Sequence, residues 1–259
     1  MRITGFIILF WVVLGSCFTG YCRERHVEIA TGVYPPWVSE DVPHGGYVNH
    51  IIVEAFGRKG YTVSFHYYPW ERAYNMARQG RHHATSFWAD SPETRKKHAA
   101  YFFKSEPVMY AKVVFFHLKE NPMQPWQTLG DLKGYRIGTM IGETSTQILK
   151  QHGLVVHDVG KAGQVFSMIL NRRLDIFPLE LLTGLDILYY QFGPDQSTLF
   201  SYDPKPMFET PASLLFSKDH QQGDRLVAVF NQGLAQLEQE GVRRKLYQDL
   251  VAGKYSKFK

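Results

Sequence analysis

A chain of 259 residues with 44% hydrophobic and 20% charged residues has the composition of a folded globular protein, long enough for one large domain or two small ones. Its formal charge of +5 is small and its basic residues are scattered, which argues against a nucleic-acid partner. Aromatic residues make up 15% of the chain, and such an excess of rings is often found where small organic ligands are stacked.

The chain begins with an export signal. Arg2 supplies the positive start, an unbroken apolar run covers residues 6–14, and small residues follow. This run is too short to span a bilayer, so we expect residues 1–22 to be a signal peptide. The segment Leu-Gly-Ser-Cys resembles a lipoprotein cleavage box in which Cys17 is acylated, whereas cleavage near Cys22 would give a soluble form. In both cases the mature domain is expected in the periplasm, without an internal disulfide.

From residue 26 onward, short apolar strands alternate with helices, a pattern typical of an α/β fold with a largely parallel sheet. The first strand runs into a loop whose prolines, Pro35 and Pro36, cannot continue it. Apolar residues at helical spacing mark the helices, and Gly80 ends the second of them. The elements expected in this first half cover residues 27–30, 47–60, 61–68 and 71–79, then an apolar strand and a helix opened by Ser91.

A second series of elements follows an apolar segment at residues 108–118. Its expected elements cover residues 128–132, 135–138, 144–152, 155–156, 164–171, 174–178 and 213–216, and the closing helices cover residues 222–241 and 242–251. Because the two series have similar plans, we expect two lobes, with crossings at residues 108–118 and 211–217. Two crossings form a hinge and leave a cleft, at the carboxyl ends of the strands, in which a ligand binds.

The window between Trp70 and Arg95 carries the strongest functional signal. The end of a strand, the N-terminus of a helix and the guanidinium of Arg95 meet there. Each of these three features favours a small anion. The residues therefore predict an anion site, and they leave open whether the anion is a bound ligand or a substrate.

The order of motifs along the chain resembles that of the bacterial extracellular solute-binding proteins of the polar amino acid class. The matching motifs are Tyr-Pro-Pro-Trp at residues 34–37, the Trp-led helix ending at Gly80, Ser-Pro-Glu-Thr-Arg at 91–95, Leu-Gly-Asp-Leu-Lys-Gly at 129–134, Gly-Glu-Thr-Ser at 142–145 and Leu-Asn-Arg-Arg-Leu-Asp at 170–175. The resemblance spans about residues 26–252. It implies a two-lobed periplasmic binding protein fold of type II, with residues 23–110 and 213–259 in lobe 1 and residues 111–212 in lobe 2.

The resemblance also implies which residues bind the ligand. Arg95 falls where family members grip a ligand α-carboxylate, and Glu180 falls where an acid accepts the α-ammonium. Tyr34 matches an aromatic residue that stacks on the ligand. The alternatives are ordinary structural roles: a surface helix arginine, an exposed glutamate at a helix start and a buried aromatic residue.

Three further residues border the cleft in the family's topology. Trp70 and Arg72 open the helix after the second strand. The alternative for Trp70 is that it only packs in the core. Thr144 resembles a second-lobe hydroxyl that caps the ligand carboxylate, and a plain helix N-cap is compatible with that role.

The chain also departs from the family pattern. Phe87 and Trp88 stand where small hydroxyl residues are common in members that bind ordinary L-amino acids, Asp90 replaces another serine, and His83 replaces a frequent aspartate. The two rings narrow the pocket, and Asp90 adds an acceptor for an ammonium or hydroxyl group. The sequence therefore predicts that Arg95 binds a carboxylate of the ligand and that the ligand is not an ordinary L-amino acid.

No metal or cofactor is expected. His82 and His83 are adjacent in an expected strand, where successive side chains point to opposite faces and cannot share one ion. The sequence contains no Cys/His cluster and no G-x-S-x-G elbow of a serine hydrolase.

The favoured function is a monomeric periplasmic protein that captures an amino-acid-like small carboxylate for the membrane permease of an ABC-type transporter. One alternative is an enzyme on the same scaffold, similar to relatives that dehydrate cyclic carboxylic acids, with Glu180 or Asp90 as general acid. Another is a sensing module that docks onto a membrane receptor.

Overall fold

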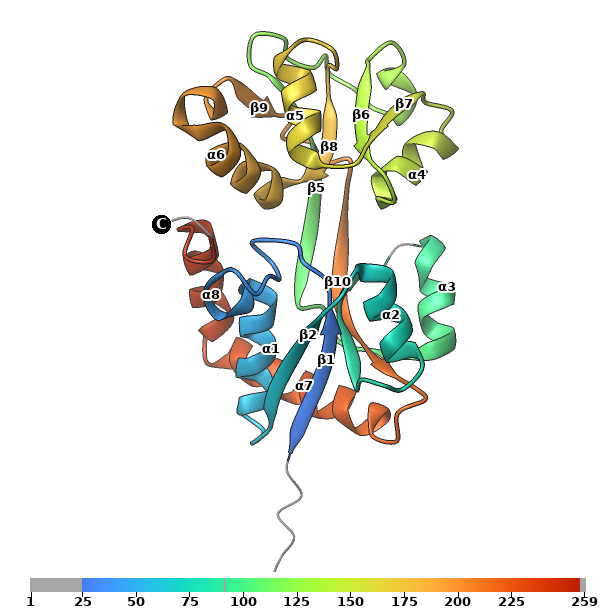
Figure 1. Ribbon diagram of the computed structural model, residues 1–259, viewed down its shortest axis with the longest axis vertical. Coiled ribbons are helices and arrows are strands. Elements are labelled where there is room, and N and C mark those ends of the chain that lie inside the picture. The colour runs from blue at the N-terminus through green and yellow to red at the C-terminus, as the bar shows by residue number, and fades with distance from the viewer. Residues whose placement is uncertain (1–24, 91, 257–259) are drawn as a thin grey trace, which may run out of the picture.

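The computed structural model describes residues 25–90 and 92–256, which fold into two α/β lobes, one above the other in Figure 1. The predicted signal peptide, including Cys17 and Cys22, lies outside these residues. Within them, no helix has both the length and the apolar character needed to cross a membrane.

The first lobe is built on three parallel strands in the order β2-β1-β3. These strands are β1 (His26–Thr31), β2 (Thr62–Tyr67) and β3 (Ala84–Ala89). The helices of this lobe are α1 (Tyr47–Gly57), α2 (Trp70–Arg78), α3 (Pro92–Tyr101), α7 (Gly223–Gln239) and α8 (Val242–Val251), with a short 3-10 turn at Pro43–Gly45. The closing helices α7 and α8 lie in the first lobe (Figure 1).

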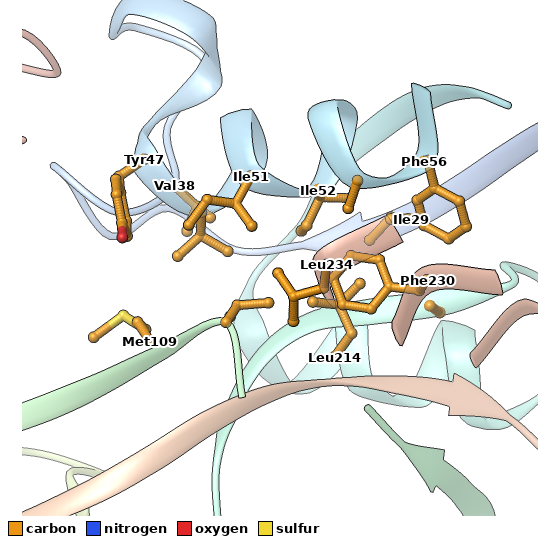
Figure 2. Close-up of a cluster of buried hydrophobic side chains, with 14 of the residues drawn as sticks. Ile29, Val38, Tyr47, Ile51, Ile52, Phe56, Met109, Leu214, Phe230 and Leu234 are labelled. Atoms are coloured by element: carbon orange, nitrogen blue, oxygen red, sulfur yellow. The ribbon is translucent and has the colours of Figure 1, made fainter. Parts of the chain in front are cut away.

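The core of the first lobe lies between its sheet and helices α1 and α7 (Figure 2). Ile51, Ile52 and Phe56 form the apolar face expected from helical spacing, and all three are fully buried. The ring centroid of Phe56 lies 5.3 Å from that of Phe230 on α7. Gly233 lets the two helices approach closely, because a Cβ atom there would collide with the backbone of α1.

Two long strands connect the lobes, β5 (Met109–Leu118) and β10 (Phe208–Ser217) (Figure 1). They pair antiparallel with each other, β10 also pairs with β3 in the first lobe, and β5 pairs with β8 in the second. A short strand, β4 (Phe102–Lys104), adds to β10. The predicted two-lobed α/β architecture with two crossings is confirmed, and the crossings are continuous antiparallel strands. The predicted lobe boundaries fall within these strands.

The second lobe contains the remaining elements. Its strands are β6 (Ile137–Met140), β7 (Val156–Val159), β8 (Phe177–Glu180) and β9 (Phe200–Tyr202), and its helices are α4 (Thr144–Gln151), α5 (Ala162–Leu170), α6 (Leu181–Ser197) and the 3-10 helix Leu129–Leu132. The sequence did not predict α6. Gly184 and the Gly193-Pro194 pair weaken its helical pattern, and Gly193 has the non-helical φ of 73°. The strand expected to end at Pro178 continues to Glu180, which caps α6.

Candidate ligand-binding site

A cavity of about 410 Å³ lies between the two lobes, against the crossing strands. Its volume is in the range found for sites of small organic ligands. Three alternate residues of each crossing strand face it, as the pleat of a strand requires. These residues are Met109, Ala111 and Val113 of β5 and Phe208, Thr210 and Ala212 of β10.

The first lobe contributes a wall of aromatic rings. The wall consists of Tyr34, Trp37, Trp70, Phe87 and Trp88. The Trp70 ring meets Trp88 and Phe87 edge to face, with centroid distances of 5.5 and 6.0 Å. It also lies directly over Gly32, where a Cβ atom would collide with the indole. The position of this ring therefore depends on a glycine in the loop that follows β1.

The second lobe presents the N-termini of two helices to the cavity, and a glutamate occupies the N-cap position of each. Glu143 precedes α4, and Glu180 precedes α6. An acid suits the positive end of a helix dipole, which explains the residue type at both positions. The same arrangement brings both carboxyl groups to the edge of the cavity.

Glu180 is buried and held by hydrogen bonds. Its Oε2 atom accepts from the backbone N–H of Thr183 at 2.8 Å and from the indole N–H of Trp37 at 3.0 Å. The same indole N–H lies 3.0 Å from the hydroxyl oxygen of Thr183. Trp37 belongs to the first lobe and Glu180 to the second, so this bond joins the lobes beside the cavity. Burial raises the pKa of Glu180, although its hydrogen bonds oppose that shift.

Glu143 differs from Glu180 because no described residue donates a hydrogen bond to its side chain. Burial raises its pKa above the ordinary value. The pKa of Tyr34 is raised well above its usual value by burial, and then by the charges of Glu143 and Glu180. Both carboxylates therefore lie close enough to Tyr34 to raise the pKa of its phenol, and the three groups share one end of the cavity.

Among the described residues that line the cavity there is no lysine, arginine or histidine. Its ionisable lining consists of Tyr34 and the two glutamates. The site is therefore an apolar, ring-walled space with negative charge at one end.

The predicted site residues divide into two groups. Tyr34, Trp70, Trp88, Thr144 and Glu180 line the cavity. Thr144 is the first residue of α4 rather than its N-cap, which is Glu143. Arg72 does not line the cavity, because its exposed guanidinium lies over the ring of Tyr68, 5.0 Å from the centroid.

Arg95 and Asp90 form an ion pair with each other, and neither residue lines the cavity. The Nε atom of Arg95 lies 3.4 Å from Oδ1 of Asp90, and the Arg95 side chain is 63% exposed. The other oxygen of Asp90 accepts a hydrogen bond of 2.5 Å from Lys104. Burial alone would raise the pKa of Asp90, but Lys104 and Arg95 outweigh it and hold that pKa below its usual value.

Sequence reasoning missed Trp37, Glu143 and Thr183. The signal for Glu143 was an acid immediately before an expected helix, which is a common N-cap pattern. Trp37 and Thr183 had no such local signal, because they meet only when the lobes are placed together.

The histidines predicted not to share an ion have separate partners. The ring of His82 lies 4.7 Å from that of His66, whereas His83 lies 4.1 Å from His220. Within residues 25–90 and 92–256, no group of three histidine, cysteine or acidic side chains is placed to hold a metal ion.

No protein-family model matches the sequence, and no curated protein matches it. Solved structures match its fold. A histidine kinase sensor domain with similarity to periplasmic binding proteins has a TM-score of 0.71 at 18% identity, over 88% of this chain and 98% of that chain. The GluR0 ligand-binding core from Nostoc punctiforme, in complex with L-glutamate, has a TM-score of 0.68 at 15% identity, over 86% and 98%.

An amino acid ABC transporter substrate-binding protein, AbpA from Streptococcus pneumoniae, bound to L-arginine, has a TM-score of 0.69 at 14% identity. That match covers 90% of this chain and 97% of AbpA. At such identities the similarity concerns the fold alone. The chain has the two-lobed α/β fold of periplasmic binding proteins.

Proposed function

We propose that this chain is a periplasmic solute-binding protein that captures a small, amino-acid-like solute between its lobes and delivers it to an ABC-type transporter. The observation that carries this proposal is the cavity at the crossing strands, with rings from one lobe and carboxylates from the other. A solute bound there contacts both lobes and therefore favours their closed arrangement.

The roles of the lining residues follow from their chemistry. Glu180 and Glu143 accept the ammonium group of the solute, and Tyr34, Trp70 and Trp88 cover its apolar part. Thr144 offers a hydroxyl group at the start of α4. The predicted grip of Arg95 on a carboxylate requires the guanidinium to leave Asp90 and enter the cleft, so Arg95 is not part of this site.

A second candidate function is ligand sensing for a membrane receptor. It is favoured by the similarity to a histidine kinase sensor domain, which covers nearly all of that domain. An enzymatic role is less well supported, since the solved structures named above are binding and sensor domains.

The test is a thermal-shift screen of the purified protein against amino acids, amines, short peptides and small carboxylic acids. A ligand at a hundredfold its Kd adds about 2.7 kcal/mol. For a protein of this size that gain raises Tm by about 5–10 °C. If no compound of any class stabilises the protein, the proposed function is wrong.

Transport and sensing are then separated in cells that lack the protein. Loss of uptake of the identified solute supports transport. Normal uptake together with a lost transcriptional response to that solute supports sensing.

A further inference from the structure

We propose that the cleft selects an organic cation through its amine or guanidine group and does not require a carboxylate on that solute. This inference rests on the proposed solute-binding function and narrows it to a substrate class.

The lining of the cavity is acidic. Glu143 and Glu180 are its acidic residues, and no described lining residue is basic. Glu180 already accepts hydrogen bonds from Trp37 and Thr183, whereas Glu143 has no donor among the described residues. A cationic solute in the cavity can therefore pair with the carboxylate of Glu143. A carboxylate on the solute would be repelled from this end of the cavity.

The aromatic wall of the cavity also favours a cation. The face of an aromatic ring is negative and attracts cations, most strongly in tryptophan. Trp70 and Trp88 both line the cavity, and their edge-to-face contact at 5.5 Å holds the two rings at a fixed angle. The rings and Glu143 therefore favour the same charge on the solute, although they come from different lobes.

The predicted carboxylate partner, Arg95, is held outside the cavity. Arg95 lies on α3, outside the lining, with its guanidinium directed to the buried Asp90. To reach the cleft it would have to leave that carboxylate with Lys104 as its remaining cationic partner in the described structure. The contact with Asp90 thus keeps this guanidinium away from the solute.

Isothermal titration calorimetry with matched pairs tests the inference, because the members of each pair differ by one carboxylate. The pairs are agmatine and L-arginine, cadaverine and L-lysine, and putrescine and L-ornithine. We expect at least one amine to bind tenfold or more tightly than its parent amino acid, which corresponds to about 1.4 kcal/mol. Arg95→Ala should leave the affinity for that amine unchanged.

Glu143→Gln should weaken binding of the amine at least tenfold, because it removes the charge while keeping the size of the side chain. Glu209→Gln is the matched control. Glu209 lies on β10 between the lining residues Phe208 and Thr210, so its exposed side chain points to the opposite face of the strand. This control makes the same change in net charge and should retain the affinity. Circular dichroism and Tm confirm that both variants are folded.

The inference is overturned if the amino acids bind as tightly as their amines, if none of the amines binds, or if Glu143→Gln has no more effect than Glu209→Gln. In each of these cases the proposed function still stands when another compound in the wider screen stabilises the protein. If an amino acid binds and Arg95→Ala abolishes that binding, the prediction that Arg95 binds the ligand carboxylate is supported instead.

Discussion

The hydrogen bond between Trp37 and Glu180 makes a quantitative prediction about how the lobes are held together. Both side chains are buried, with residue exposures of 3% and 6%, so solvent screens the interaction little. A hydrogen bond to a charged group contributes about 1.5–3 kcal/mol. We therefore expect a coupling energy of that size in a double-mutant cycle of Trp37→Phe and Glu180→Met.

The cycle is needed because each single substitution has other effects. Trp37→Phe leaves a smaller ring, and Glu180→Met also removes the cap of α6, but both costs cancel in the coupling term. The free energy of unfolding is measured by guanidinium chloride titration with circular dichroism, at about pH 8 so that the carboxylate is ionised. A coupling energy below about 0.5 kcal/mol, within the error of additivity, would show that the bond does not join the lobes in solution.

Three further predictions concern the first lobe. Phe56→Ala should lower the free energy of unfolding by about 3–5 kcal/mol in denaturant titration, because it empties a fully buried site. Gly32→Ala should displace the Trp70 ring and weaken binding of any solute identified by the screen at least tenfold, measured by calorimetry. Burial, with His220 close by, lowers the pKa of His83 to about 4. The neutral His83 side chain therefore contributes its full stability above about pH 6.5, and this contribution is lost as the pH falls toward 4. Between about pH 7 and about pH 5, the Tm of His83→Gln should therefore fall less than the Tm of the parent protein.

Each of these predictions has a contrary outcome. A loss below about 1 kcal/mol for Phe56→Ala would mean that this core collapses around the missing ring. Gly160→Ala is the control for Gly32→Ala, because a Cβ atom there meets no other residue. Equal affinities of the two glycine variants would contradict the role given to Gly32. Equal acid sensitivity of His83→Gln and the parent protein would show that other groups govern the response to pH.

The alternation of strands and helices, the apolar face of α1 and the two crossings were all predictable from the sequence. The alternation and the apolar face depend on residues two to four positions apart, whose spacing decides which face of a strand or helix is buried. The two crossings followed from the similar plans of the two series of elements. Helix α6 was not predictable in this way. Its pattern is interrupted by glycine and proline, and its position depends on packing against α5 and on the cap that Glu180 provides.

The candidate site was only partly predictable. The motifs placed Tyr34, Trp70, Trp88, Thr144 and Glu180 at the cleft, and the structure has them in the cavity lining. The direction of Arg95 depended on Asp90 and Lys104, and no local pattern encodes the path of a long exposed side chain.

The net charge of the cavity lining was decided by tertiary structure, although the family resemblance had already placed Glu180 at the cleft. Trp37 and Glu180 are 143 residues apart in the chain, yet they share a hydrogen bond beside the cavity. Glu143 joins them from a third segment, at the start of another helix. Short-range periodicity determines the elements because it acts between neighbours in sequence. The charge of a cleft is a sum over distant segments, and it exists only after folding brings those segments together.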